Sequence, residues 1–538
     1  MVNMKYRKML PVLKKAKYER KVLSKGSVNG ENALPLLCDV LFEKDVAVPM
    51  RDGVKLYTDI FRPAGTEKVP AIIAWSPYGK TFRGDEVCGI QRSNLQKFEA
   101  PDPAFWVNQG YAIINIDSRG IGNSEGQFVH WSKALGRDGY DTVEWIANQE
   151  WSNGHVGLAG NSYLAISQWF IAAERPPHLF AIAPWEGFSD VFHESVCPGG
   201  IPDTEMLDIC EKFIFKGRGK LEVLSDYAKK NPYLDEVWKE KIAAVEDIEV
   251  PAYVVASYAN KVHGRGTLES FEKLGSKKWL RIHNTHEWKD FYTHQDELLL
   301  FFDHFLKNID NGWEKTPKVR VSILNPGGKD VVEKAEAAYP PENIQSYKCY
   351  FDSASKMIKE ELPGKESVST YLSNNNKDSI SFIYKFKSDT DIMGSINIKL
   401  WVSAQNAKDM DIFVTARKLD KNGEFLPVMV YGAPYCKKGE PAVFEWGNGR
   451  CRASARVNDY EPHYLKENEI IPVNIKLCQM GMHFDKGQQM EIIISGYNIA
   501  VPELSIQKQI KPMNKGIHKV YTGGKYDSSL VIPIYDHI

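Results

Sequence analysis

Short apolar runs alternate with amphipathic stretches through residues 41–324 of the chain. Four runs are apolar enough to be buried strands, and they cover 71–75, 111–116, 156–158 and 180–183. Stretches with helical periodicity separate the later runs, notably 138–149 and 165–173. Strands that alternate with helices predict a parallel sheet with helices on both faces. Before the first run, alternating apolar and polar residues around Arg51-Asp52-Gly53 predict a β-hairpin.

The pattern changes twice further along. Residues 189–249 are rich in helix formers without a clear strand, which predicts a helical cap inserted into the sheet domain. After a Pro- and Gly-rich, linker-like stretch at 325–345 the period becomes two, which predicts a β-sandwich, in particular a jelly roll. The predicted domains are therefore a basic N-terminal extension (1–40), a sheet domain in two parts (41–188 and 250–324), the cap (189–249), the linker (325–345) and the β-sandwich (346–538).

The first 25 residues carry nine Lys and Arg side chains, opposed only by Glu19. We expect a solvated helical extension here, and the alternative is an arm that docks on a partner subunit or an acidic surface. The apolar run at residues 9–13 is too short for a secretory signal and contains a proline. No run of 18 apolar residues predicts a membrane span.

The composition indicates which class of molecule the protein binds. The 538 residues hold 68 Lys and Arg against 69 Asp and Glu, so no net field favours nucleic acid or an anionic membrane. A small molecule is the expected partner, and a homo-oligomer stays open. The eight cysteines show no CxxC pair, and no HExxH motif occurs, so we expect a cytoplasmic protein with free thiols and neither metal nor cofactor.

Ser162 is the leading candidate for a nucleophile. It lies in Gly160-Asn161-Ser162-Tyr163-Leu164, between the apolar run at 156–159 and the helical stretch at 165–173. A strand, a sharp turn and a helix form the context of a nucleophile elbow, in which the helix N-terminus offers N–H groups to an oxyanion. The alternative is an ordinary helix N-cap serine. Leu164 departs from the usual motif, because it fills a helix-packing position where glycine often lies.

Several motifs together resemble the cocaine esterase-like and X-Pro dipeptidyl-peptidase-like serine hydrolases. They are, in chain order, the hairpin 50–56, Pro77-Tyr78-Gly79-Lys80, the loop 117–126, the segment 138–145 and the Ser162 elbow. The resemblance covers nearly the whole chain. It implies an α/β-hydrolase domain with an inserted helical cap, followed by a C-terminal jelly roll.

The resemblance also implies site residues. The Tyr78 hydroxyl and the backbone N–H of Tyr163 are expected to bind the oxyanion. Chain order in α/β-hydrolases is nucleophile, acid, histidine, so the base is expected after the run at 279–282. His283 and His286 both follow it, and we favour His283, which lies at the strand end.

Asn260 stands where the acid of the triad is expected. A neutral amide accepts a hydrogen bond from imidazole but supplies no charge, and the corresponding Asp→Asn change in a serine protease costs about 10⁴ in turnover. Three interpretations follow: a triad of Ser162, His283 and Asn260, a weakened enzyme, or a carboxylate recruited from elsewhere. The candidates for that carboxylate are Glu269, Glu287 and Asp290. Asn260→Asp is expected to leave activity similar or to raise it.

The expected function is hydrolysis of an ester or amide through an acyl-enzyme, most simply by a carboxylesterase or acylase acting on a small ester, amide or short peptide. An X-Pro dipeptidyl-peptidase or an amino-acid ester hydrolase is the alternative, in which Glu186 would bind a substrate ammonium. Aromatic residues of the cap would line an apolar acyl pocket, and they are Phe188, Phe192, Phe213 and Phe215. A binding protein that uses the jelly roll is the alternative from another class.

Overall fold

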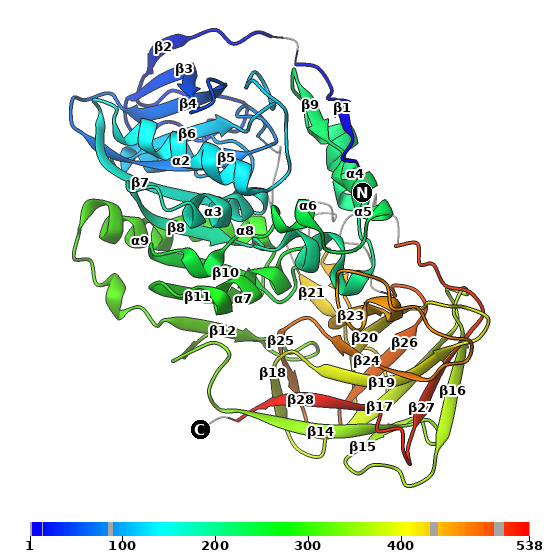
Figure 1. Ribbon diagram of the computed structural model, residues 1–538. Coiled ribbons are helices and arrows are strands. Elements are labelled where there is room, and N and C mark those ends of the chain that lie inside the picture. Colours follow the sequence, from blue (N-terminus) through cyan, green and yellow to red (C-terminus); the bar gives the residue numbers. More distant parts are fainter. Residues whose placement is uncertain (1–2, 13, 84–89, 431–439, 500–509, 537–538) are drawn as a thin grey trace.

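The computed structural model describes residues 3–12, 14–83, 90–430, 440–499 and 510–536. A large mixed sheet forms the N-terminal part, and a second body built from strands lies beside it (Figure 1). In spatial order the large sheet contains β13 (Val331–Glu336), β12 (Val319–Ile323), β11 (Lys278–His283), β10 (Ala252–Ser257), β8 (Leu179–Trp185), β7 (Ser152–Asn161), β5 (Val69–Ser76), β6 (Ala112–Asp117), β4 (Lys55–Pro63), β3 (Val40–Pro49) and β2 (Glu19–Leu23).

The strands from β12 to β6 are parallel to one another, and the strands outside them pair antiparallel. The central strands are buried on both faces, which explains their continuous apolar sequences. Ile72 and Ile113 belong to the core on one face, whereas their neighbours Ile73 and Ile114 belong to the core on the other. This alternation gives the sheet two hydrophobic faces that helices must cover.

Helices cover both faces. One core includes residues of α2 (Lys133–Ala147), α3 (Tyr163–Ala173) and α7 (Gly264–Lys273). The other includes residues of α1 (Pro103–Asn108), α8 (Glu287–Thr293) and α9 (Gln295–Lys307). The predicted doubly covered sheet is therefore confirmed, and so is the hairpin, because β3 and β4 pair antiparallel around residues 50–54. The short helix α1 was not predicted.

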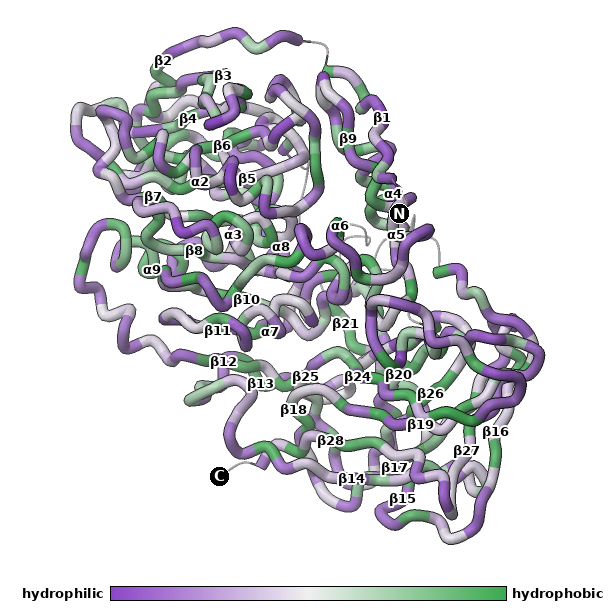
Figure 2. Tube along the Cα trace, in the orientation of Figure 1, coloured by the Kyte–Doolittle hydropathy of each residue, from purple (hydrophilic) through white to green (hydrophobic). Residues whose placement is uncertain are grey.

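The N-terminal residues form strands, so the prediction of a helical extension was wrong. β2 pairs antiparallel with β3 at the edge of the large sheet, and β1 (Tyr6–Lys8) pairs with β9 (Lys220–Glu222). Arg20 and Lys21 of β2 are exposed, which is typical of an edge strand that must not pair with another sheet, whereas Arg7 of β1 is half-buried. The stretch before β2 is largely hydrophilic (Figure 2).

Short helical segments dominate the region predicted as a cap, and in Figure 1 α4, α5 and α6 lie beside the β1–β9 ribbon. The segments are η2 (Val191–Val196), η3 (Pro198–Gly200), α4 (Glu205–Ile209), η4 (Cys210–Ile214), α5 (Leu224–Lys230), α6 (Glu236–Lys239) and η5 (Val245–Asp247). The predicted linker at 325–345 is not free of structure. It contains β13, which pairs antiparallel with β12, since the turn-forming residues 325–328 reverse the chain rather than release it.

The C-terminal body is rich in β-strands and has its own core. After η6 (Trp313–Lys315) and β12–β13, its elements are β14 (Ile344–Asp352), β15 (Met357–Lys359), β16 (Ser367–Leu372), β17 (Ser379–Lys385), β18 (Thr390–Gly394), β19 (Asn397–Ala404), β20 (Asp411–Leu419), β21 (Val428–Val430), β22 (Ala442–Phe444), β23 (Gly447–Arg452), η7 (Ala453–Ala455), β24 (Ile471–Lys476), β25 (Met480–Phe484), β26 (Gln489–Ser495), β27 (Ile517–Thr522) and β28 (Ser529–Tyr535). Its pairings are antiparallel apart from β15 with β17. Within the described parts of the chain, no helix is long and apolar enough to cross a membrane.

Candidate active site

Ser162 lies in a strained turn between β7 and α3. Its backbone has φ 57° and ψ −120°, a conformation that L-residues rarely adopt. Gly160 makes the turn feasible, because a Cβ at this residue would lie 2.5 Å from the Cβ of Leu164. The large Leu164 is thus tolerated in the elbow because residue 160 has no side chain.

The Ser162 hydroxyl contacts a histidine that the sequence did not single out. Its Oγ lies 2.9 Å from Nε2 of His263, at the N-terminal end of α7. The His263 ring stacks on Phe188 with their centroids 5.7 Å apart. Burial lowers the pKa of His263 to about 3, and its Nδ1 has no hydrogen-bond partner within the described chain. The ring is therefore neutral, and no acid orients it.

Tyr78 and Tyr163 both lie at the elbow. The Tyr78 ring has its centroid 6.2 Å from that of Tyr163 and 5.3 Å from that of Phe98. Tyr163 is the first residue of α3, so its N–H belongs to the first turn, where backbone donors have no intrahelical acceptor. The Tyr78 hydroxyl interacts with Ser162, and burial raises the pKa of Tyr78 well above its usual value. Both groups therefore remain hydrogen-bond donors beside the candidate nucleophile.

A second polar cluster lies at the ends of β8, β10 and β11. His283 Nε2 lies 2.7 Å from Glu186 Oε1, and His283 Nδ1 lies 3.2 Å from Thr285 Oγ1. Asp290 is 3.7 Å from His283 Nδ1 and makes a bidentate pair with Arg281. Both nitrogens of His283 thus face groups other than Ser162, and its role as the base stays a prediction.

The contacts of Asn260 explain why this residue is an amide. Its Nδ2 donates to Glu287 Oε2 at 2.6 Å and to Glu186 Oε2 at 3.3 Å. Its Oδ1 accepts the backbone N–H groups of Val262 and His263, at 3.0 and 2.9 Å. A flipped amide would oppose like groups on both sides, so these contacts fix its orientation. Asn260 thus stabilises the turn that carries His263, and its side-chain amide uses both its donor and its acceptor atom in these hydrogen bonds.

The remaining sequence candidates occupy separate places. His286 is the N-cap of α8, where its Nδ1 accepts the Trp288 N–H at 3.3 Å. Burial, reinforced by His283, lowers the pKa of His286 to about 4. Glu269 pairs with Arg265 and Lys476, at 3.2 and 3.0 Å. Among the described residues, no group of His, Cys, Asp and Glu side chains has the arrangement of a metal site.

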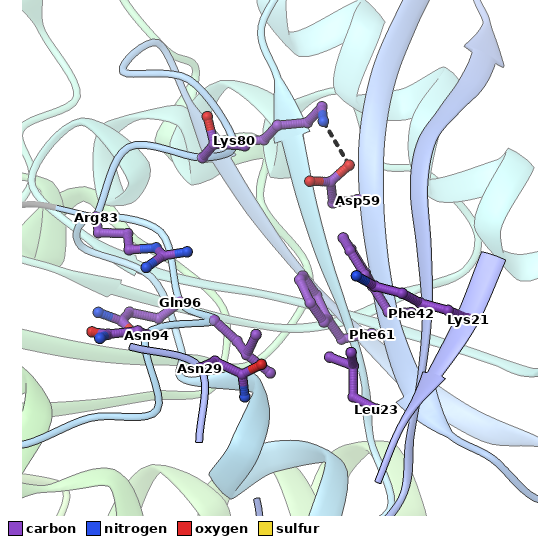
Figure 3. A pocket seen from close by; sticks show the side chains of 12 residues that line it. Lys21, Leu23, Asn29, Phe42, Asp59, Phe61, Lys80, Arg83, Asn94 and Gln96 are labelled. Carbon is purple, nitrogen blue, oxygen red and sulfur yellow. Dashed lines mark hydrogen bonds and ion pairs between the residues drawn. The ribbon is translucent and has the colours of Figure 1, made fainter. Parts of the chain in front are cut away.

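A pocket of about 210 Å³ lies on another part of the domain, beside β2, β3 and β4 (Figure 3). Lys80 and Asp59 point toward each other there, with Nζ and Oδ1 2.6 Å apart. Lys80 also pairs with Asp45 at 2.6 Å, and its backbone N–H donates to Asp117. This buried network fixes the loop that carries Tyr78, and it gives the Pro77–Lys80 motif a structural reason.

The sequence did not indicate two residues of the site, which are His263 and Glu99. Glu99 is 1% exposed, and its carboxyl interacts with Trp288, Ser162 and Tyr78. His263 carries one available signal, because it follows the apolar residues of β10 in the same turn as Asn260. Glu99 lies in a segment without periodicity, so only the folded chain brings it to Ser162.

A sheet with parallel central strands and a serine on a strained strand-to-helix turn defines the α/β-hydrolase class. Comparison with known proteins agrees. Residues 52–215 match the family model of the X-Pro dipeptidyl-peptidase (S15 family), and residues 311–531 match that of the X-Pro dipeptidyl-peptidase C-terminal non-catalytic domain.

The structure is similar to a CocE/NonD family hydrolase from Staphylococcus aureus, with a TM-score of 0.87, 31% identity and 97% of each chain covered. The cocaine esterase of a Rhodococcus species is 37% identical over 167 residues, which are 30% of this chain and 27% of that protein. An α-amino acid ester hydrolase has the same fold at 17% identity, with a TM-score of 0.66 over 91% of this chain and 96% of that one. The chain belongs to the CocE/NonD family of hydrolases.

Proposed function

We propose that the protein is a serine hydrolase that cleaves ester or amide bonds through an acyl-enzyme at Ser162. The observation that carries the proposal is the Ser162 hydroxyl at a strained elbow, 2.9 Å from an imidazole nitrogen. Backbone strain of this kind persists at functional sites because the surrounding structure enforces it.

In the first step Ser162 Oγ bonds to the acyl carbon while its proton passes to the imidazole. The tetrahedral oxyanion is held by the Tyr78 hydroxyl and the Tyr163 N–H, each worth about 3 kcal/mol in the transition state. The acyl carbon–leaving group bond then breaks, and the leaving group takes the proton from the imidazole. Water repeats the sequence on the acyl-enzyme, which releases the acid and restores Ser162.

We assign the base to His263, because this ring is the imidazole that hydrogen bonds to Ser162 in the described part of the chain. Its low pKa makes it a weak base in the resting site, so slow turnover is expected. His283 and His286 remain the candidates that the sequence favours. Replacing each of the three histidines by Gln separates them, since loss of the true base should lower kcat by about 10²–10⁴.

An apolar acyl group is the favoured substrate moiety. Phe215 packs near both Tyr78 and Tyr163, and Phe188 lies against His263, whereas Phe213 is exposed and Phe192 packs on Trp238. Both oxygens of Glu186 are engaged by His283 and Asn260, so this carboxylate is not available for a substrate ammonium. These contacts support a carboxylesterase or acylase over a dipeptidyl-peptidase.

Three finer properties belong to the same proposal: a cytoplasmic location, a jelly-roll topology and the absence of a cofactor. The cysteines that the structure describes are free thiols, which supports a reducing compartment. Assembly into a homo-oligomer is an alternative within the same proposal.

The decisive experiment compares the wild type with Ser162→Ala on short-chain aryl esters, X-Pro anilides and amino-acid esters. Wild type is expected to hydrolyse the aryl esters and to be labelled by a fluorophosphonate, and Ser162→Ala to do neither. Unchanged turnover in the variant would refute the mechanism. A folded wild type that is neither labelled nor active would favour the binding protein.

A further inference from the structure

Glu99 is tied to the elbow through its backbone. Its carbonyl oxygen accepts the Asn161 N–H at 3.0 Å, one residue before Ser162. Its φ is +63°, an unusual value for a residue with a side chain. The local conformation would favour glycine, and a buried glutamate at this position therefore points to a use for the carboxyl.

The two carboxyl oxygens of Glu99 have different surroundings. Oε1 accepts the indole N–H of Trp288 at 3.0 Å. Oε2 is buried and makes no hydrogen bond of normal geometry within the described residues. The Tyr78 and Ser162 hydroxyls lie close enough to interact with the carboxyl. One oxygen of the Glu99 carboxyl is thus unused, and two hydroxyl groups of the site lie near this carboxyl.

No cation neutralises this carboxyl, since Glu99 forms no ion pair across the described part of the chain. The other titratable groups that it affects are Cys210 of the cap and Tyr292 of α8, both of which burial keeps neutral. Burial raises the pKa of Glu99 to about 8, and the hydrogen bonds from Trp288, Ser162 and Tyr78 offset only part of this effect. At neutral pH the carboxyl holds a proton, which belongs on Oε2 because Oε1 is the acceptor.

We propose that Glu99 is a positioning residue whose neutral carboxyl donates its Oε2–H to the Tyr78 hydroxyl oxygen and so directs the Tyr78 hydrogen toward the oxyanion. No proton is transferred, and each hydroxyl donates one hydrogen bond in sequence. Chained donors of this kind strengthen one another, and a buried neutral carboxylic acid is a known donor beside an oxyanion. The inference rests on the proposed hydrolytic function.

The opposite role, a Glu99 carboxylate that takes the proton of Ser162, fits the site less well. It would place a negative charge next to the oxyanion, and no cation among the described residues pairs with that charge. Ser162 also has His263 as its hydrogen-bond partner. The two roles predict opposite pH dependence, because a donor fails above the pKa of Glu99 and a base fails below it.

The test is the pH profile of kcat for an activated aryl ester. The wild type is expected to lose about tenfold or more between pH 7 and pH 9.5, as Glu99 ionises. Glu99→Gln keeps a donor and should stay within about threefold of wild type at pH 7 without the alkaline decline. Glu99→Ala should lower kcat by about 10- to 100-fold with little change in KM. Glu194→Gln, which removes another buried carboxyl of raised pKa, is the control and should keep the decline.

An alkaline decline that persists in Glu99→Gln would overturn the proposal, and so would activity that rises with pH in the wild type and vanishes in Glu99→Gln. A second readout does not depend on turnover. The infrared difference spectrum at pH 7 between Ser162→Ala and Ser162→Ala/Glu99→Gln should contain the band of one protonated carboxyl, because the other buried carboxyls are common to both variants. If the protein hydrolyses nothing, the proposed function fails, while this band still decides the protonation state; its absence would overturn the present inference.

Discussion

At the scale of single residues, Asn260 shows how a neutral side chain can be required where a charge is expected. Its Nδ2 lies between Glu186 and Glu287, and its Oδ1 accepts two backbone N–H groups that shape the turn at His263. An aspartate could still accept the two backbone N–H groups. Its carboxylate would, however, face Glu186 and Glu287 with an acceptor where the amide has a donor. The amide therefore separates two buried carboxylates.

Asn260→Asp is expected to destabilise the protein by about 1–3 kcal/mol at pH 8, because a carboxylate would replace the donor between two acceptors. The sequence predicts that this change leaves activity similar or raises it, and the contacts add an expected loss of stability, which is a separate quantity. Like charges and burial raise the folded-state pKa of such a cluster above the unfolded value, so the loss grows as pH rises above about 4. Thermal unfolding at pH 5 and pH 8 should show a larger deficit at pH 8.

Asn284→Asp is the matched control. Asn284 donates to a single carboxylate, Asp330, at 2.8 Å, and is only partly buried. Asn284→Asp should lower the free energy of unfolding by less than Asn260→Asp does, and this loss should depend less on pH. Equal deficits in the two variants, or a stabilised Asn260→Asp, would contradict the explanation.

The sequence could indicate Ser162, Tyr78 and Tyr163, because each belongs to a motif whose neighbours in the chain define its environment. It could not indicate Glu99, whose relation to Ser162 depends on a loop folding across the end of β7. His263 is an intermediate case. The chain shows the residue in the correct turn, but the contact with Ser162 depends on where α7 begins.

At the scale of elements, the elbow depends on the close approach of Gly160 in β7 and Leu164 in α3. A Cβ at residue 160 would lie 2.5 Å from Leu164 Cβ and 3.1 Å from the Glu99 carbonyl oxygen, and φ there is +144°. Neither neighbour is the flexible end of a side chain. The strand, the helix and the Glu99 loop are therefore packed against a position that must remain a glycine.

Gly160→Ala is expected to destabilise the protein by about 2–4 kcal/mol, from backbone strain and overpacking together, and to abolish fluorophosphonate labelling of Ser162. Gly154→Ala on the same strand isolates the strain. Gly154 also has a positive φ, of +86°, but its added Cβ would meet only His178, at 3.8 Å. This control should lose about 1 kcal/mol and keep its labelling. Similar unfolding temperatures and labelling rates in the two variants would show that the contact with Leu164 does not shape the elbow.

Element prediction succeeded where an apolar run or a helical period governs a whole segment, as in β5 and α2. It failed at β2 and β13. β2 is a charged edge strand whose pairing with β3 leaves little apolar signal, and β13 follows turn residues that resemble a linker. Edge strands depend on a partner elsewhere in the chain, so local sequence describes them poorly.

At the scale of the whole molecule, the cap and the C-terminal body meet through charged groups as well as through packing. His193 of η2 places Nδ1 2.7 Å from Asp190 and Nε2 3.1 Å from Asp459 of the C-terminal body. Arg450 adds an ion pair with Asp203 at 2.9 Å. The sequence predicted two bodies, but the His193–Asp459 and Arg450–Asp203 contacts join residues more than 200 positions apart, and no local pattern reveals such a pairing.

The hydrogen bonds of His193 to Asp190 and Asp459 should make the contact between the cap and the C-terminal body depend on pH. Burial lowers the pKa of His193, but the hydrogen bonds to Asp190 and Asp459 outweigh this effect and raise the pKa to about 10. A folded pKa above the unfolded value of about 6.5 means that the pair stabilises fully below pH 6.5 and loses its contribution as pH rises through about 10. Asp459→Asn should therefore lower the unfolding temperature at pH 6 and have little effect at pH 10.5, as differential scanning fluorimetry can measure.

The control Glu461→Gln removes an exposed charge from the same loop, 3.9 Å from His463, and should change the unfolding temperature little at either pH. A deficit in Asp459→Asn that is equal at both pH values would show that Asp459 acts through packing alone, and the charge of His193 would then contribute nothing to holding the two bodies together.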